Sequence, residues 1–456
     1  MITTPPAPSA ARPMHFPKAV ELALANGLRV VAVTQRNLPL VAAHLIVRCG
    51  ATSDPQDHPG LATMTATLLT QGAGALSATQ IAERVDALGA RLDATAGFDA
   101  STLSVMAMTT KFRAALELAG TVVRSPSFTI DDLERVKAKA LSDLKLTYGS
   151  PNGLARLVAT RLAFGEGPYG HPLAGTPASV AALSRDDVVA FHRSHYVPSR
   201  SLLVIGGDLD PEEAFALASD VFGGWDDPKD VAPDIREVAP PKPRFVVVDQ
   251  PAAGRTAIVT ANPAARRHAD DYYAGVVATA ILSGYSGRLN QEVRIKRGLS
   301  YGAGAQLIAR RAAGLFTAAT LVDHRKAAEA TEVVCATLRG LLESPPPPGE
   351  LATRKTNVLG NFARSVETIE GLISAFGEYA LYDVGLDEIK RFEGTIGAIG
   401  APAVVEFARR YVAVEPSIAL VGHAVDFIED LARFDRPIER IPFEAVDLGS
   451  ASLRAG

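Results

Sequence analysis

The chain has 456 residues, of which 47% are hydrophobic, so it is long enough for roughly two to four domains with large apolar cores. Its formal net charge is −4 with both signs mixed along the chain, which argues against a nucleic-acid-binding protein, because such proteins carry a basic patch. Cys49 and Cys335 lie too far apart in sequence to suggest a CxxC metal site, and both are expected to be buried. No stretch approaches the roughly 18 apolar residues of a transmembrane helix.

The N-terminal segment, Met1 to Phe16, is rich in Pro and Ala and lacks the basic and apolar regions of a signal peptide. We expect a flexible tail over residues 1–17. Such tails also occur at the mature N-terminus of exported proteins whose signal peptide has been replaced by a start Met, so the compartment is left open. We expect a soluble protein of the bacterial periplasm or cytoplasm.

An internal repeat divides the chain. An apolar strand pair that starts at Arg29 returns at Arg244, 215 residues later, and a helix-to-strand unit that starts at Val188 returns at Val404, 216 residues later. Two segments that agree within one residue predict two homologous domains, over 18–225 and 244–456. The Asp- and Pro-rich stretch 226–243 between them is typical of an extended linker.

Within the first half, a capping box at Ser77 and Gln80 begins a predicted helix that Gly89 ends, and alternating apolar residues over 90–108 predict a hairpin. Ser184 and Asp187 mark the start of another helix. In the second half, the prolines at 345–348 separate two helices. These blocks of strands and helices predict an α+β fold with helices packed on a mainly antiparallel sheet in each domain.

Chemistry-bearing motifs are sparse. Nucleophile elbows, phosphate-binding loops and dinucleotide-binding fingerprints are all absent from the sequence. His192 and His195 form the only close histidine pair, but no acid follows at ligand spacing, so we interpret them as polar residues at a helix end. His58 precedes a Pro-Gly turn and has no second candidate metal ligand nearby in the sequence pattern. The Gly-rich stretch 283–287 is interpreted as a turn before a helix.

A basic segment over residues 288–302 stands out. It begins as a predicted helix, breaks at Gly298 and enters a strand of small residues that carries Tyr301. Composition alone suggests a solvated cationic helix face.

Several motifs, in a fixed order along the chain, resemble the pitrilysin/insulinase family of zinc peptidases, especially its small two-domain branch with the mitochondrial processing peptidases. They are Gly50–Asp54 with Gly60-Leu61-Ala62, Leu88-Gly89-Ala90 with Leu92-Asp93-Ala94, Ser125-Pro126-Ser127-Phe128, Tyr169–Leu173 with Gly175-Thr176, and Ser286 to Tyr301. The resemblance runs essentially end to end.

The family's inverted zinc motif, His-x-x-Glu-His, follows its "gly-leu-ala" segment. The matching positions here are Thr63, Met64, Thr65, Ala66 and Thr67, so both histidines and the general-base glutamate are replaced. The family's third ligand, a Glu about 76 residues further on, falls near Asp143. The resemblance therefore implies that this chain holds no metal and no other cofactor.

Family members also present an Arg and a Tyr from the C-terminal domain opposite the zinc. Arg294 and Tyr301, seven residues apart, match them. The resemblance implies that these two residues bind substrate and stabilise the oxyanion in trans, within a heterodimer whose zinc-bearing sibling supplies the metal. The expected substrates are unfolded peptides, bound as an added β-strand.

Two alternatives remain at this point. One is a purely structural or peptide-binding subunit with no part in catalysis, although such a subunit has no need of the Arg/Tyr pair. The other is a peptidase that uses different ligands, which the sparse histidines argue against.

Overall fold

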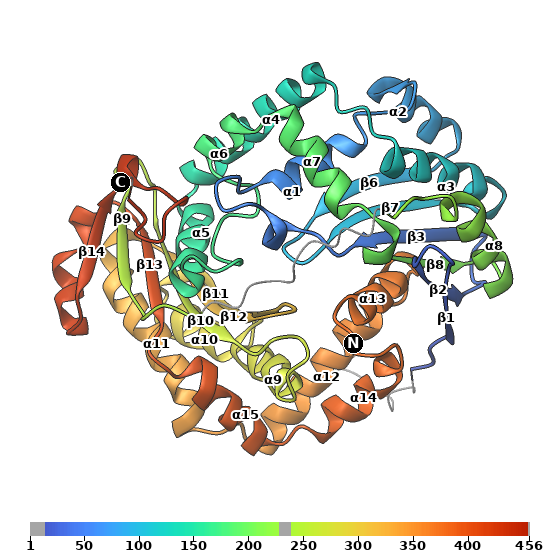
Figure 1. Ribbon diagram of the computed structural model, residues 1–456. Helices are drawn as coiled ribbons and strands as arrows, with labels where there is room; N and C mark the ends of the chain where they lie inside the picture. Colours follow the sequence, from blue (N-terminus) through green and yellow to red (C-terminus); the bar gives the residue numbers. More distant parts are fainter. Residues whose placement is uncertain (1–13, 228–238, 455–456) are drawn as a thin grey trace, which may run out of the picture.

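The computed structural model describes residues 14–227 and 239–454, which form two six-stranded sheets with helices packed on them (Figure 1). The first half contains β1 (Ala19–Ala23), β2 (Arg29–Thr34), β3 (Leu40–Val47), α1 (Leu61–Leu69), β4 (Gly72–Ala73), β5 (Leu76–Ser77), α2 (Ala78–Ala87), β6 (Arg91–Ala96), β7 (Ser101–Met108), α3 (Thr109–Arg124), α4 (Ile130–Gly149), α5 (Pro151–Phe164), α6 (Pro177–Ala182), α7 (Arg185–His195), β8 (Ser201–Gly207) and α8 (Pro211–Phe222).

The second half repeats this alternation. It contains β9 (Phe245–Asp249), β10 (Thr256–Ala264), α9 (Tyr272–Leu282), α10 (Arg288–Asn290), a π-helical turn (Gln291–Ile295), β11 (Ser300–Ala309), β12 (Gly314–Val322), α11 (Ala327–Glu343), α12 (Pro348–Ser365), α13 (Ile369–Leu381), α14 (Glu388–Ala398), α15 (Ala401–Phe407), a second π-helical turn (Ala408–Val412), β13 (Ser417–Gly422) and β14 (Ile438–Pro442).

The two sheets share one strand order. The first runs β1-β2-β8-β3-β7-β6 and the second β14-β9-β13-β10-β12-β11, so five strands correspond one to one. Only β2–β8, β9–β13 and β9–β14 pair in parallel, and the other pairs are antiparallel. The predicted α+β fold with two related, mainly antiparallel domains is therefore confirmed.

Several local predictions also agree with the structure. The Ser77–Gln80 capping box is present at the start of α2, β6 and β7 form the hairpin, and the prolines separate α11 from α12. Both cysteines are buried, and burial raises the pKa of Cys335 to about 11.

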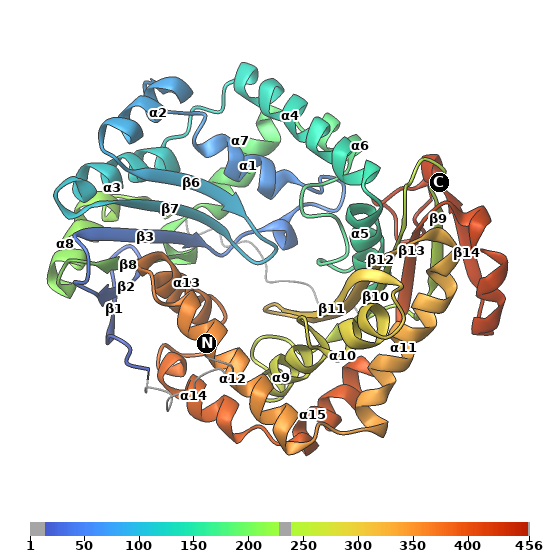
Figure 2. The same ribbon diagram turned by 180° about the vertical axis from the view of Figure 1, so that it is seen from behind.

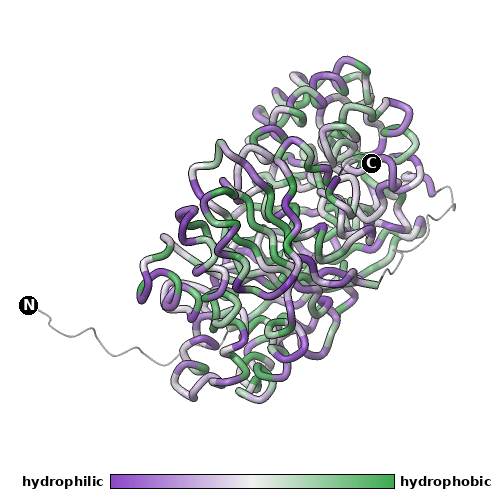
Figure 3. Tube along the Cα trace, turned by 90° about the vertical axis from the view of Figure 1, so that its left-hand side faces the viewer, coloured by the Kyte–Doolittle hydropathy of each residue, from purple (hydrophilic) through white to green (hydrophobic). Residues whose placement is uncertain are grey.

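Figure 3 shows hydrophobic strands within the molecule and hydrophilic segments around them. Within residues 14–227 and 239–454, no helix combines the length and the apolar character that a bilayer crossing requires.

One helix of each half packs on the sheet of the other half. Helix α5 packs on β10 and β13 of the second sheet, and α13 packs on β3 and β8 of the first, so both lie on the inner faces of the sheets (Figures 1 and 2). Glycines allow the close approach of α13, because a Cβ on Gly377 would lie 2.6 Å from Ile46 Cδ1, and one on Gly206 would lie 2.9 Å from the Val33 carbonyl oxygen and from Ile373 Cγ2.

This exchange was not evident from the repeat. The boundaries at 18–225 and 244–456 remain a prediction, and much of the predicted linker (228–238) and tail (1–13) lies outside the described residues. Because each sheet buries a helix from the other half, the two halves are expected to fold and unfold as one cooperative unit.

The tips of two hairpins join the sheets a second time. Asp99, at the β6–β7 tip, accepts hydrogen bonds from the Tyr169 hydroxyl (2.6 Å) and from the Arg311 backbone N–H (3.0 Å) at the β11–β12 tip. The Arg310 guanidinium carbon lies 3.9 Å from the centre of the Phe98 ring. These contacts fix the distance between the two sheets at one end of the cavity described below.

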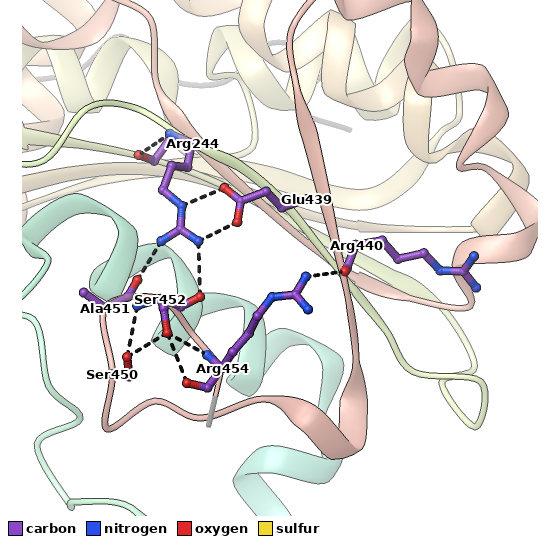
Figure 4. Close-up of polar contacts among 8 residues, drawn as sticks. Arg244, Glu439, Arg440, Ser450, Ala451, Ser452 and Arg454 are labelled. Atoms are coloured by element: carbon purple, nitrogen blue, oxygen red, sulfur yellow. Dashed lines mark hydrogen bonds and ion pairs between the residues drawn. The ribbon is translucent and has the colours of Figure 1, made fainter. Parts of the chain in front are cut away.

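The C-terminal segment forms a clasp over the outer edge of the second sheet, shown in Figure 4. Arg244 donates two hydrogen bonds to the carboxylate of Glu439 in β14, at 2.7 and 2.6 Å, and a third to the Ala451 carbonyl at 2.6 Å. Leu448 and Leu453 are fully buried in the core that contains α5. The clasp therefore ties the end of the chain to both halves.

Replacing Arg244 with Met is expected to lower the free energy of unfolding by about 1–2 kcal/mol at pH 7, since bidentate charge-assisted bonds are strong but this pair is partly exposed. Arg244 holds the pKa of Glu439 below its usual range. A carboxyl with a lowered folded pKa stabilises the fold above its unfolded pKa of about 4.3, and this contribution is lost as the pH falls through the folded pKa.

The stability difference between wild type and Arg244→Met should therefore shrink below about pH 4, as urea denaturation at pH 7, 5 and 3 would show. Arg113→Met is the matched control, because its ion pair with Asp220 has both side chains more than half exposed. A difference that is the same at all three pH values would contradict the assigned role of Glu439.

Candidate functional site

Helix α1 carries the positions that match the zinc motif, and its N-terminus is held by a buried carboxylate. Asp54 accepts hydrogen bonds from the backbone N–H groups of Gly60 and Ala62, each at 2.7 Å, and its side chain is fully buried, 3.5 Å from His171 Nε2. Burial raises the pKa of Asp54. Gly60 has a φ of +95°, and a Cβ there would lie 2.9 Å from the Gly175 backbone.

Three segments from two of the family-like motifs thus meet at one place, the start of α1. The loop that ends at Asp54, the turn at Gly60 and the segment around His171 form one support for the helix. The sequence analysis identified these segments as motifs but assigned no role to Asp54. The structure shows that this support for α1 is present in a chain with Thr63, Ala66 and Thr67 on that helix.

Asp54→Ala is expected to lower the free energy of unfolding by about 2–4 kcal/mol, because two buried N–H groups would lose their acceptor. Urea denaturation at neutral pH measures the loss. Asp210→Ala is the control, since Asp210 caps α8 in an exposed position and its loss should cost about 1 kcal/mol. Equal losses for the two variants would contradict the structural role of Asp54.

Two side chains of α1 at the positions compared with the family's zinc motif are hydrogen-bonded to the backbone. Thr63 donates to the Leu173 carbonyl at 2.7 Å, Thr67 donates to the Thr63 carbonyl at 2.8 Å, and Ala66 is buried. Asp143, in α4, pairs with Lys139 at 2.6 Å on the exposed face of that helix. Within residues 14–227 and 239–454, no three His, Cys, Asp or Glu side chains are grouped so as to hold a metal ion.

The histidine pair behaves as expected for a helix end. His192 Nε2 lies 2.8 Å from the Val123 carbonyl and His195 Nδ1 lies 3.0 Å from the Phe191 carbonyl, and burial lowers both pKa values. His58 has two acidic neighbours: its Nδ1 lies 2.9 Å from Asp57 Oδ1, and its Nε2 lies 3.9 Å from Asp187 Oδ2. The helix that presents Asp187 returns to this loop, which local sequence could not reveal.

The basic segment has the predicted course with one addition. Only Arg288–Asn290 is α-helical, and Gln291–Ile295 continues as a π-helical turn, a feature often found at functional sites. Gly298, with a φ of +60°, reverses the chain, so that the Leu299 N–H bonds to the Val293 carbonyl at 2.9 Å. Arg294 and Tyr301 therefore lie on opposite sides of one tight turn.

Neither of these two side chains is buried in the core. Tyr301 is 75% exposed, at a bulge where the pairing of β11 with β12 shifts between Ser300 and Ala303. The Arg294 guanidinium carbon lies 5.6 Å from the centre of the Tyr285 ring. The Arg255 guanidinium carbon lies 4.8 Å from the centre of the Tyr301 ring. The sequence analysis assigned no functional role to Arg255, or to Tyr285 within the Gly-rich stretch 283–287.

The loop that carries Tyr285 is fastened to β11. Ser283 Oγ donates to the Ala305 carbonyl at 2.7 Å and accepts from the Ala305 N–H at 2.8 Å. Asn290, which is buried, donates to the Tyr285 carbonyl at 2.7 Å. Since Ser283 occupies the outer edge of β11 at Ala305, a peptide strand could not add there without displacing it.

A cavity of about 530 Å³ lies between the two halves. Its lining comes from both sheets and from the exchanged helix, and includes His44 of β3, Thr95 of β6, Gln306 of β11 and Glu378 of α13. Strand β6 ends the first sheet, and no described residue bonds to the backbone of its free edge. This edge is therefore open to an added strand.

Comparisons with known proteins agree with this geometry. The family described as "Insulinase (Peptidase family M16)" matches residues 29–176, and "Peptidase M16 inactive domain" matches residues 182–358. A crystal structure described as the peptidase M16 inactive domain from Pseudomonas fluorescens has a TM-score of 0.83 and 25% identity, covering 89% of this chain and 98% of that one. A protease from Helicobacter pylori has the same fold, with a TM-score of 0.82 and 19% identity over 89% of this chain and all of that one.

Among curated relatives, an uncharacterized zinc protease of Mycobacterium leprae is 26% identical over 61% of this chain and 63% of its own length. The match thus spans less than two thirds of that relative. An uncharacterized zinc protease of Rickettsia bellii is 22% identical over 88% of this chain and 96% of its own length.

Fold, repeat and matched segments together define a two-domain protein of the peptidase M16 class. The chain belongs to the M16 family, the insulinase or pitrilysin peptidases, in its small two-domain branch.

Proposed function

We propose that this chain is the non-catalytic subunit of a heterodimeric zinc peptidase, in which a zinc-bearing M16 sibling supplies the metal and this chain supplies Arg294 and Tyr301. The observation that carries the proposal is the contrast between two sites. Thr63 and Thr67 of α1 donate their hydroxyl hydrogens to backbone carbonyls, whereas Arg294 and Tyr301 remain accessible and carry unused hydrogen-bond donors.

The charged residues of the basic segment 288–302, which carries Arg294 and Tyr301, support this role. Arg288 pairs with Glu350 at 2.6 Å, and Glu292 pairs with both Lys296 and Arg297 at 2.5 Å. Arg294, in the same segment, has no acidic partner among the described residues. A guanidinium and a phenol with free donors are suited to bind a substrate carbonyl and the negative charge that develops on it during hydrolysis.

The proposed substrates are unfolded peptides that enter the cavity between the halves. The open edge of β6 offers backbone N–H and C=O groups along one side of this cavity, so an extended peptide can add to the first sheet as a further strand. The blocked edge of β11 leaves β6 as the better candidate for this contact.

Co-expression tests the proposal. This chain and an M16 sibling with an intact His-x-x-Glu-His motif from the same organism should co-purify, and the complex should cleave unstructured peptides that neither chain cleaves alone. Full activity of the sibling by itself would overturn the proposal and leave this chain a structural or peptide-binding family member.

A further inference from the structure

Two arginines, Arg294 within the basic segment 288–302 and Arg255 beside it, differ from the other basic residues there. Arg288, Lys296 and Arg297 all pair with glutamates. By contrast, no described residue accepts a hydrogen bond from the guanidinium of Arg255 or Arg294 or forms an ion pair with it. Each of these two guanidinium groups lies over the ring of an exposed tyrosine. A ring contacts the face of a guanidinium and leaves its N–H donors, which point outward in the plane, free for an anion.

The register of the second sheet brings Arg255 to Tyr301. Arg255 immediately precedes β10, whose first residue, Thr256, pairs with Val322 of β12, and Val322 pairs on its other side with Ser300 of β11. Arg255 and Tyr301 therefore emerge at the same end of three adjacent strands, which agrees with the 4.8 Å between guanidinium carbon and ring centre.

The tyrosine beside Arg294 lies in a loop that is hydrogen-bonded to β11. Tyr285, the partner of Arg294, follows Ser283, which bonds to both backbone groups of Ala305, and its carbonyl accepts from Asn290. The backbone of Tyr285 is thus held by Asn290, and the start of its loop is held by Ser283.

We propose that Arg255 is a further substrate-contacting residue that binds a carboxylate of the peptide, so that the complex prefers peptides with an acidic side chain near the cleaved bond. This inference rests on the proposed function. The proposed function assigns Arg294 to the carbonyl of the cleaved bond. Arg255, which lies over the Tyr301 ring, is then free to bind a neighbouring side chain of the peptide. An arginine fork matches a carboxylate in two parallel hydrogen bonds, whereas it gains much less from the neutral amide of glutamine.

Paired peptides test the preference. A set with Glu or Gln at one position, scanned across the cleavage site, is compared by kcat/KM with the complex of this chain and its zinc-bearing sibling. At the preferred position the Glu peptide should be favoured roughly tenfold, as expected for one charge-assisted pair. Arg255→Gln should bring the ratio close to one, and Arg255→Lys should retain part of it.

Arg297→Gln is the matched control, because Arg297 lies in the same segment but is already paired with Glu292. It should leave the Glu/Gln ratio as in wild type. Binding of the same fluorescent peptides to this chain alone, measured by anisotropy, gives a readout that does not require the sibling, and Arg255→Gln should weaken binding of the Glu peptide selectively.

The outcomes separate the two proposals. If Arg294→Ala and Tyr301→Phe lower turnover while Arg255→Gln leaves the Glu/Gln ratio and the binding unchanged, Arg255 has no such role and the proposed function stands. A wild type with no preference for Glu overturns the inference in the same way. If the complex has no activity beyond that of the sibling but Arg255→Gln still weakens binding of the Glu peptide, the proposed function fails and the carboxylate site remains.

Discussion

Tyr301→Phe is expected to lower kcat of the assembled peptidase by about a hundredfold or more, with the heterodimer and its zinc content intact. The substitution removes one hydroxyl donor and keeps the ring that Arg255 covers. Loss of a single oxyanion donor typically costs on the order of 3 kcal/mol of transition-state stabilisation. Because Tyr301 is 75% exposed, the fold should not depend on its hydroxyl.

Arg294→Ala should lower turnover at least as much, since a cation helps both to place the substrate and to neutralise the developing charge. Its guanidinium has no acidic partner among the described residues, so removing it leaves no unpaired charge in the chain. Steady-state kinetics on the purified complex, with size-exclusion chromatography and metal analysis of each variant, separates a chemical effect from loss of assembly.

Turnover within about twofold of wild type for both variants, with the dimer intact, would make the Arg/Tyr segment a family relic. Arg297→Gln is again the control, because Arg297 shares the segment but is paired with Glu292. A loss of activity that occurs only when the two chains separate would favour a structural subunit.

The sequence predicted the α+β fold and the repeat well, because both depend on local signals. Capping at Ser77, the turn at Gly298 and the apolar strands are each decided by a few neighbouring residues. The exchange of α5 and α13 was not predicted, because both helices are amphipathic segments whose partner sheets lie far away in sequence. Periodicity shows which residues of a helix are buried but not against what.

The candidate site shows the same limit. Arg294 and Tyr301 follow from a motif, whereas Arg255 joins them only through the register of three strands. The approach of Asp187 to His58 depends on where α7 returns, and the role of Asp54 depends on the fold of the loop before α1. Contacts between distant segments carry no signal that a single sequence can display.

The isolated chain is expected to hold no stoichiometric zinc, whereas the heterodimer should hold one zinc ion that its activity requires. Zinc sites in peptidases need three protein ligands from imidazole or carboxylate groups. Thr63 and Thr67 instead donate their hydroxyl hydrogens to backbone carbonyls, and Ala66 offers no base for a water. Asp143, the remaining carboxylate, is paired with Lys139.

Metal analysis after chelation and reloading with zinc tests this expectation on this chain, on the sibling and on the complex. Chelation of the complex should abolish peptide cleavage, and zinc should restore it, while this chain remains free of metal throughout. The matched experiment replaces a histidine of the sibling's motif, which should remove both zinc and activity while the two chains still associate. One tightly bound zinc ion in this chain alone would contradict the whole assignment, because the metal would then be held by residues other than those of α1.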